Sequence, residues 1–307
     1  CDGNCTDGAG TAPGADDNGS GTAAVLEAAR VMAGTHFAGT IVFACFDGEE
    51  LGLWGSAHFA NEMREAKAPI SAVLNNDIIA NSTGGDGRSE PQVVRVFSEG
   101  LAAGTVDARV NSLGSENDSP ARELARFVGS TAPVYVPAMS IRQIFRADRF
   151  LRGGDQESFS AQGYAAIRFV EAHENFTHQH QDVQIKNGVQ YGDLLQYNDW
   201  EYLARVTQIN VAALAALALG PAAPANAQLV TKRLGYDSTL RWSAVPGASY
   251  EIVWRATDAP DWQFGRNVGD VVEAGVPVSK DDYILGVRAV DALGHRSLVS
   301  YPSPVRE

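Results

Sequence analysis

The stretch from Thr40 to Ala60, TIVFACFDGEELGLWGSAHFA, decides the fold class of this 307-residue chain. Its first part, Thr40 to Phe46, is a short apolar run rich in β-forming residues, which is typical of a buried strand. The part from Leu53 to Lys67 has the pattern of a helix. A buried strand that leads through an acidic loop into a helix is a unit from which α/β folds are built.

Strand and helix candidates alternate around this stretch. Further strands are predicted from short apolar runs, at 72–79, 91–97, 140–145 and 165–171. Further helices are predicted from apolar residues at helical spacing, at 18–32, 118–127 and 194–219. This alternation predicts an α/β domain whose sheet is covered by helices on both faces.

The character of the sequence changes at Gly220. Residues 221–226 (PAAPAN) form a Pro/Ala linker that cannot continue a helix. Beyond it, runs such as SYEIVWRAT and DYILGVRAVD alternate as strands do and are separated by turn clusters. We therefore predict two domains, an α/β domain over residues 1–220 and a small β-sandwich over residues 227–307.

The chain is acidic, with 24 Lys+Arg against 37 Asp+Glu and a formal net charge of −13. This balance argues against a nucleic acid or an anionic membrane as partner, because both attract positive charge. The longest strongly apolar stretch, Ile209 to Leu219, is shorter than the about 20 residues that span a bilayer. We therefore expect neither nucleic-acid binding nor membrane insertion.

The chain opens in a loop-like run rich in Gly and Asp, without Met or a signal peptide. We expect from this that upstream structure is missing, and targeting evidence with it. Cys1 and Cys5 share this run and are candidates for a small disulfide. Cys45 lies in an apolar run, where we expect a buried thiol.

Acidic side chains stand at strand ends and helix starts, where ligands usually bind in open α/β sheets. Asp17, in DDNGSG, either belongs to a helix cap or holds a cation. Glu49 and Glu50 follow a predicted strand and suit the positive end of the next helix. Alternatively, one of them binds a metal and the other acts as general base. Two adjacent carboxylates repel each other unless a cation or a proton lies between them.

Two further motifs carry candidate ligands. Asp77 interrupts the apolar run LNNDII, where a carboxylate is costly to bury unless it is paired, metal-bound or at the exposed strand end. His178 and His180 lie in ENFTHQHQD, after a predicted strand. A lone loop histidine is commonly a solvated surface residue, whereas two histidines beside acids favour metal binding.

In their order along the chain, these motifs resemble the co-catalytic di-zinc aminopeptidase family, peptidase family M28. The family also contains glutamate carboxypeptidases and glutaminyl cyclases. The resemblance covers about residues 10–220 and implies a three-layer αβα domain with a mixed, mostly parallel sheet. The C-terminal region resembles a fibronectin type III domain, whose core would hold Trp242 and Tyr250. The motifs that carry the first resemblance are PGADDNGSGTAAVLEAARVM (13–32), TIVFACFDGEELGLWGSAHFA (40–60), LNNDII (74–79) and the loop with the two histidines.

The resemblance implies a role for each matching acid. Asp17 matches the carboxylate that bridges two zinc ions, and its bond to Asn18 matches a peptide that is often cis in the family. Glu49 matches the general base. Glu50 matches a ligand of one zinc ion, and Asp77 matches a ligand of the other.

The histidine ligands are incomplete in this chain. The last His ligand of the family is followed four residues later by Asp, which His178 and Asp182 fit, so His178 is the predicted ligand and His180 the alternative. Another family His ligand lies upstream of the matching segment, and we expect it to precede Cys1. The chain then holds one complete zinc site, while the full-length protein is expected to bind two Zn²⁺ ions.

These inferences lead to a zinc-dependent aminopeptidase that hydrolyses N-terminal residues from peptides. Glu49 would act as general base toward the attacking water. A glutaminyl cyclase-like acyltransferase is the alternative within the enzyme class. A non-catalytic peptide-binding module or an inactive fragment is the alternative outside it. Family members with such appended domains are often exported, so we expect a secreted or periplasmic protein.

Overall fold

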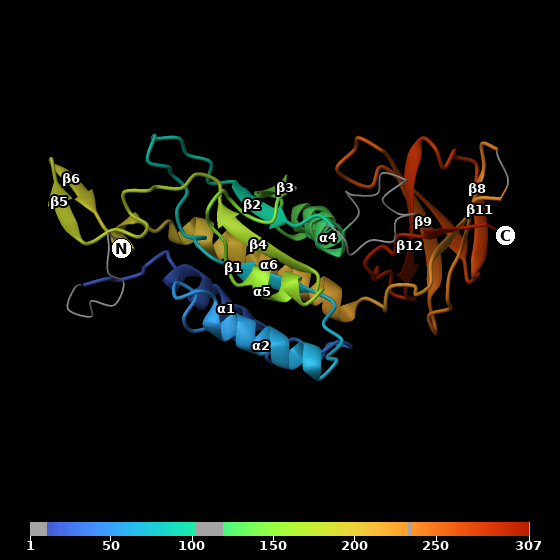
Figure 1. Cartoon of the computed structure of the whole chain (residues 1–307), viewed down its shortest axis with the longest axis horizontal. Helices are drawn as coiled ribbons and strands as arrows, with labels where there is room; N and C mark the ends of the chain where they lie inside the picture. The colour runs from blue at the N-terminus through green and yellow to red at the C-terminus, as the bar shows by residue number, and fades with distance from the viewer. Residues whose placement is uncertain (1–10, 102–118, 233–234, 307) are drawn as a thin grey trace. The chain divides into compact units, whose positions relative to one another are not determined.

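The structure is a computed structural model that describes residues 11–101, 119–232 and 235–306. The disulfide predicted between Cys1 and Cys5 lies outside the described residues. The chain divides into two compact units (Figure 1). The first contains residues 1–35, 42–99 and 128–213, and the second contains residues 36–41, 100–127 and 214–307. The domain boundaries placed at residues 220 and 227 from the sequence stay a prediction.

The first unit contains a mixed four-stranded sheet with the order β1-β4-β2-β3. Strand β4 pairs in parallel with β1 and in antiparallel orientation with β2, and β2 pairs in parallel with β3. Every residue of β4 is buried, including the charged Arg168 and Glu171 among its apolar residues. The strands are β1 (Val73–Asn76), β2 (Val93–Ser98), β3 (Ser140–Ile144) and β4 (Ala166–Glu171). The mixed sheet of the αβα domain is therefore confirmed.

Helices flank this sheet, and Figure 1 shows α1 and α2 together on one side of it. Helix α1 packs against β1, while α5 contacts both β1 and β4. The helices are α1 (Gly19–Met32), α2 (Trp54–Glu65), α4 (Pro120–Tyr135), α5 (Gln156–Ala161), α6 (Trp200–Leu219) and the short 3₁₀ helix η1 (Leu195–Tyr197). A small hairpin, β5 (Gln184–Lys186) and β6 (Val189–Tyr191), stands between β4 and η1.

Helix α6 is the one helix of the described residues that is long and apolar enough to cross a membrane, with a mean hydropathy of 1.4. Length and composition do not separate such a span from the core helix of a domain. Here Tyr202, Val206 and Ile209 are at most 1% exposed. The side chains of Asn76 and Asn210 exchange two hydrogen bonds of 2.9 Å, which tie the helix to the end of β1. The contacts of α6 are those of a core helix.

The segment from Thr40 to Phe46 is not a strand in the structure, contrary to the expectation from its composition. A strand exists only where a neighbour exchanges backbone hydrogen bonds with it, and no described segment does so here. Val42 is 69% exposed, and Cys45 is an exposed free thiol rather than a buried one. Apolar composition thus predicted the burial of this segment wrongly.

The second unit is largely β-structure. Strands β10-β9-β12 form an antiparallel sheet, and β11-β8-β7-β13 form a mixed sheet in which β13 pairs with β7 in parallel. Trp242 and Tyr250 lie in its core, with ring centroids 5.3 Å apart, as predicted. The strands are β7 (Gln228–Val230), β8 (Ser238–Arg241), β9 (Ser249–Ala256), β10 (Phe264–Gly269), β11 (Glu273–Val276), β12 (Tyr283–Val290) and β13 (Ser303–Val305). The predicted all-β sandwich is confirmed.

Candidate metal centre

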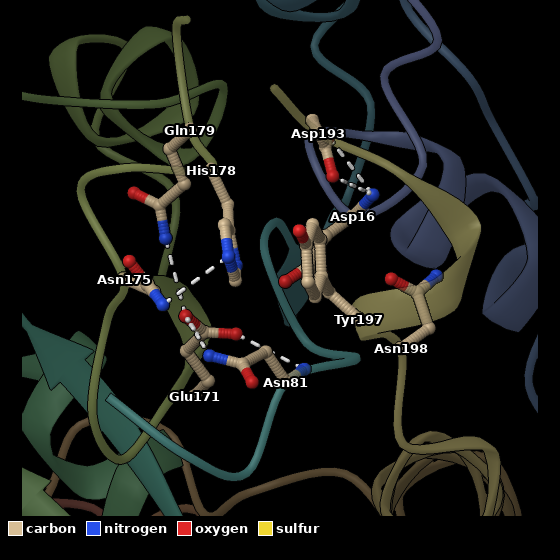
Figure 2. A pocket seen from close by; sticks show the side chains of 9 residues that line it. All are labelled: Asp16, Asn81, Glu171, Asn175, His178, Gln179, Asp193, Tyr197 and Asn198. Carbon is tan, nitrogen blue, oxygen red and sulfur yellow. Dashed lines mark hydrogen bonds between the residues drawn. The ribbon is translucent and has the colours of Figure 1, made fainter. Parts of the chain in front are cut away.

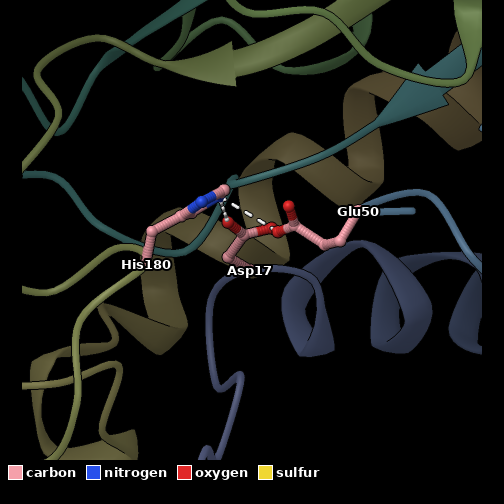
Figure 3. A group of neighbouring side chains, drawn as sticks. All are labelled: Asp17, Glu50 and His180. Carbon is pink, nitrogen blue, oxygen red and sulfur yellow. Dashed lines mark ion pairs between the residues drawn. The ribbon is translucent and has the colours of Figure 1, made fainter. Parts of the chain in front are cut away.

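The structure brings together three side chains from distant parts of the first unit: Asp17, Glu50 and His180 (Figure 3). The Nε2 atom of His180 lies 2.8 Å from Oδ2 of Asp17 and 3.0 Å from Oε1 of Glu50. One ligand atom from each residue lies within 4.8 Å of the other two. We call these three residues the donor group.

Local structure places Asp17 at the start of α1. The next residue, Asn18, caps the helix by accepting a hydrogen bond from the Gly21 N–H at 2.9 Å. The Asn18 amide also donates to the carbonyl of Asn76 at 2.9 Å, which joins the helix start to the end of β1. Gly21 is required here, because a Cβ would collide with that carbonyl oxygen. The bond between Asp17 and Asn18 is cis, as the resemblance implied.

Glu50 lies in the turn that leads into α2. Gly48 begins this turn with φ +71°, a conformation that favours glycine, and its carbonyl accepts a hydrogen bond from the Trp54 N–H at 3.2 Å. The Gly52 and Leu53 N–H groups both donate to the carbonyl of Glu49, at 3.0 and 2.9 Å. His180 follows β4 in a turn and itself has φ +53°. Three loops therefore supply the donor group.

The electrostatics of the donor group show a positive charge held between two carboxylates. Hydrogen bonds to Asp17 and then Glu50 raise the pKa of His180 to about 10. Burial opposes ionisation of Asp17, but the hydrogen bond and charge of His180 outweigh it and lower the pKa of Asp17. When His180 is protonated, its imidazole supplies the positive charge between the two carboxylates that a bound cation would otherwise supply.

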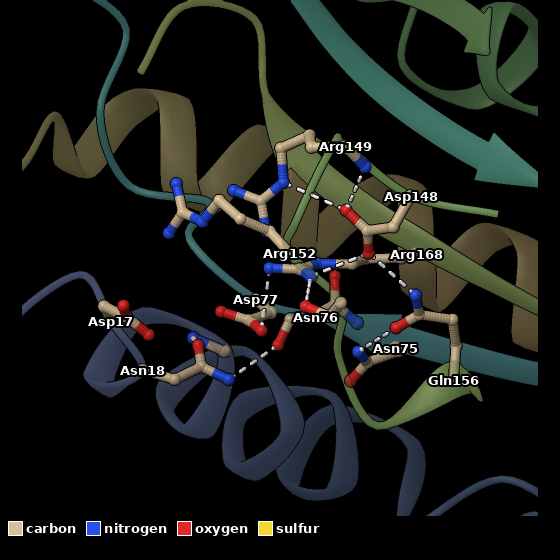
Figure 4. A network of polar contacts seen from close by, with 12 residues as sticks. Asp17, Asn18, Asn75, Asn76, Asp77, Asp148, Arg149, Arg152, Gln156 and Arg168 are labelled. Carbon is tan, nitrogen blue, oxygen red and sulfur yellow. Dashed lines mark hydrogen bonds and ion pairs between the residues drawn. The ribbon is translucent and has the colours of Figure 1, made fainter. Parts of the chain in front are cut away.

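Asp77 lies beside the donor group at the end of β1 (Figure 4). It is 5% exposed, and its Oδ2 atom pairs with Nη2 of Arg168 at 2.9 Å. Burial raises the pKa of Asp77 to about 7; Arg168 opposes this rise and the charge of Asp17 adds to it. The Oδ1 atom is buried without a hydrogen-bond partner among the described residues. A buried, unpartnered carboxylate oxygen facing an acidic site is what a cation would satisfy.

Glu49 is half-buried next to Glu50. Burial, followed by the negative charges of Asp77, Glu50 and Asp155, raises the pKa of Glu49 to about 7. The Glu49 carboxyl therefore lies among the same acids as the donor group without being one of its three members.

His178 does not lie in the donor group, although the sequence spacing selected it. Its ring stacks on Tyr197, with centroids 3.7 Å apart and planes at 11°. Its Nε2 atom lies 3.3 Å from the Asn175 amide nitrogen, and it lines a small neighbouring cavity (Figure 2). The alternative, His180, takes the place beside Asp17. Asp182, on which the choice of His178 relied, is exposed.

Behind the donor group lies a buried polar layer that the sequence did not reveal. Asp16 and Glu171 share a hydrogen bond, and burial raises the pKa of both. Asp193 accepts hydrogen bonds from the backbone of Asp16 (Figure 2). Arg168 joins Asp77 to Asp148, at 2.9 and 2.8 Å. The charges of Arg168 and Glu171 within the apolar strand AIRFVE were a signal for this layer.

The residues present fit a zinc ion. Carboxylate oxygens and imidazole nitrogens are usual zinc ligands, and catalytic zinc sites use three protein ligands. Asp17, Glu50 and His180 provide such a set. The free oxygen of Asp77 extends it toward a second position. The fold and this site together define a candidate metal-dependent enzyme with an αβα domain.

Comparison with known proteins identifies the family. The model of peptidase family M28 matches residues 6–209. The chain therefore belongs to peptidase family M28, a family of hydrolases that act on peptide bonds. It is 44% identical over 299 residues to a probable zinc metalloprotease of Leptosphaeria maculans, covering 95% of this chain and 69% of the relative. The chain spans between 60% and 70% of the length of the curated relatives it matches.

Solved structures resemble each part of the chain. A zinc aminopeptidase from Bacillus subtilis is 22% identical, with a TM-score of 0.46, over 66% of this chain and 42% of that chain. A fibronectin type III-like protein from Clostridium thermocellum is 22% identical, with a TM-score of 0.25, over 29% of this chain and 95% of that chain.

Proposed function

We propose that the protein is a zinc-dependent aminopeptidase that removes N-terminal residues from peptides. The observation that carries the proposal is the convergence of Asp17, Glu50 and His180, which lie far apart in the sequence. Family membership supports peptide bonds as the target, and the name of the 44% identical relative supports zinc as the metal.

In this proposal, Asp17, Glu50 and His180 hold one zinc ion, with His180 in the place first given to His178. Asp77 offers its free Oδ1 atom to a second ion, beside the carboxylate of Asp17. Bound zinc would polarise the peptide carbonyl and lower the pKa of the attacking water. The acidic surroundings would also attract the free α-amino group of a peptide, which favours exopeptidase activity.

Glu49 is the proposed general base. Its carboxylate would accept a proton from the attacking water and donate it to the leaving amine. Its half-buried position beside Glu50 and near Asp77 supports this role. The neighbouring Asp155 directly precedes α5 in the loop GGDQESF, which resembles the segment that lines the family's substrate pocket.

Hydrolysis of aminoacyl p-nitroanilides tests the activity. Release of p-nitroaniline is expected from substrates with a free α-amino group and not from their N-acetylated counterparts. Equal hydrolysis of both forms would contradict exopeptidase action. Cyclisation of N-terminal glutamine without peptide hydrolysis would instead indicate the glutaminyl cyclase alternative. Peptide binding without turnover would indicate a non-catalytic module.

The role of Glu49 is tested by Glu49→Gln, which keeps the size of the side chain and removes the base. We expect kcat to fall by about 10²–10⁴-fold while bound zinc, measured by elemental analysis, is retained. Glu62→Gln is the matched control, because Glu62 is an exposed glutamate on α2 that pairs only weakly with His58, at 3.4 Å. Turnover that survives Glu49→Gln would refute the assignment of the base.

Export from the cell, to the medium or the periplasm, is also part of the proposal. It rests on the family resemblance and on the appended β-domain. Separation of the host cells from the medium, followed by immunodetection, tests it, and a signal confined to the cell lysate would count against it.

A further inference from the structure

We propose that Asp193 is a positioning residue for the metal centre, which holds the segment carrying Asp17 through both oxygens of its carboxylate. The Oδ1 atom accepts a hydrogen bond from the Asp16 N–H at 2.9 Å. The Oδ2 atom accepts one from the Asp17 N–H at 2.8 Å and lies 3.0 Å from the Asp16 nitrogen. The inference rests on the proposed function, because it takes Asp17 as a zinc ligand.

Two successive backbone N–H groups that point at one carboxylate form a small anion-binding concavity. Asp193 is 8% exposed, so these charge-assisted bonds lie in a poorly solvated environment, where they are strong. The residue lies 176 positions after Asp17, between the β5–β6 hairpin and η1. A segment distant in sequence thus fixes the backbone of Asp17 itself.

Other contacts hold the neighbours of Asp17. Asn198 donates to the carbonyl of Ala15 at 3.1 Å, and Asn18 donates to the carbonyl of Asn76 at 2.9 Å. Of these anchors, Asp193 is the charged one, and it binds the ligand residue directly. A zinc site tolerates deviations of only about 0.2 Å in its ligand distances. Loss of the Asp193 carboxylate should therefore loosen Asp17 and weaken zinc binding.

The experiment measures the zinc dissociation constant of the purified 307-residue chain by competition with a chromogenic chelator. Asp193→Ala is expected to weaken zinc binding by about 10–100-fold, the usual effect of removing a group that orients a metal ligand. Asp193→Asn retains one acceptor oxygen and should give a smaller loss. This second variant keeps the side-chain size, so it serves if the alanine variant does not fold.

Asp199→Asn is the matched control. Asp199 is an aspartate of the same connecting segment, and it accepts hydrogen bonds from the Tyr202 N–H at 3.0 Å and the Ser82 hydroxyl at 2.6 Å. Its contacts support the start of α6 and not the donor group. The control should lower the thermal midpoint of the metal-free protein and leave its zinc affinity unchanged. A purely structural role for Asp193 would give the same pattern.

The outcomes separate the two proposals. Weaker zinc binding in the Asp193 variants, with unchanged binding in Asp199→Asn, supports the positioning role, whether or not the protein hydrolyses peptides. Unchanged affinity in both Asp193 variants overturns the role and leaves the aminopeptidase proposal standing. Absence of zinc binding by the unaltered chain overturns both.

Discussion

Replacement of Glu123 by Ala is expected to destabilise the second compact unit. Glu123 lies on α4 within that unit and is 4% exposed. Its oxygens accept hydrogen bonds from the Val299 N–H at 3.0 Å, the Trp262 indole N–H at 3.0 Å and the Tyr301 hydroxyl at 3.2 Å. The substitution removes the acceptor from all three donors at once.

The magnitude follows from the two N–H donors. A buried donor left without its acceptor costs about 1–3 kcal/mol, so the pair costs about 2–6 kcal/mol. Burying the carboxylate itself opposes folding, since burial raises the pKa of Glu123 to about 7. Removal of that cost offsets part of the loss. We therefore expect the free energy of unfolding to fall by about 2–4 kcal/mol.

The assay is urea denaturation followed by tryptophan fluorescence, to which Trp262 contributes directly. Glu273→Ala is the control, because Glu273 is a partly exposed glutamate of the same unit that pairs with Arg241 at 2.7 Å. A surface ion pair contributes about 0–1 kcal/mol. If Glu123→Ala costs no more than Glu273→Ala, the argument from the buried donors is refuted.

Three further predictions concern both units. His180→Ala should remove bound zinc and His178→Ala should retain it, as elemental analysis of the dialysed variants would show; the reverse result would restore the assignment made from sequence spacing. The pKa of Glu123 rises on folding from 4.5 to about 7, so its stabilising contribution is complete below pH about 4.5 and is lost as the pH rises through 7. The urea midpoint of the second unit should therefore decrease as the pH is raised from 5 to 8, and Glu123→Gln should reduce that decrease. An identical decrease in both proteins would count against this prediction. Asn210→Ala should lower the stability of the first unit by about 1–3 kcal/mol, because it leaves the buried Asn76 amide unpaired; thermal denaturation that matches the unaltered protein would contradict this.

Most of the fold followed from local patterns in the sequence. The runs 72–79 and 165–171 contain the strands β1 and β4, and every residue of β4 is buried while β1 is half-buried up to Asn76. The run from Thr40 to Phe46 has the same composition and is not a strand. Composition reports the tendency of a segment to pair, but pairing requires a neighbour, and the segment alone does not contain that information.

The acids of the site were predictable because Asp17 stands before a predicted helix, Glu50 follows a predicted strand and Asp77 interrupts an apolar run. Which histidine joins the donor group was not predictable, because His178 and His180 lie in one motif and differ only in the direction that a turn gives their side chains. The turn gives His180 a φ of +53° and a side chain that reaches Asp17. Asp193 escaped notice because its partners are backbone N–H groups, which leave no mark in the sequence.

The origin of the donor group in three separate loops has a consequence for how the protein resists damage. An ion held by all three loops would link them as a cross-link does, so opening any one loop would require the ion to leave or lose a ligand. Protease sites in the turn before α2 or in the turn after β4 would then be protected together, by a single ligand, although 130 residues separate Glu50 from His180. A single cut in either loop would, conversely, release the constraint on the other.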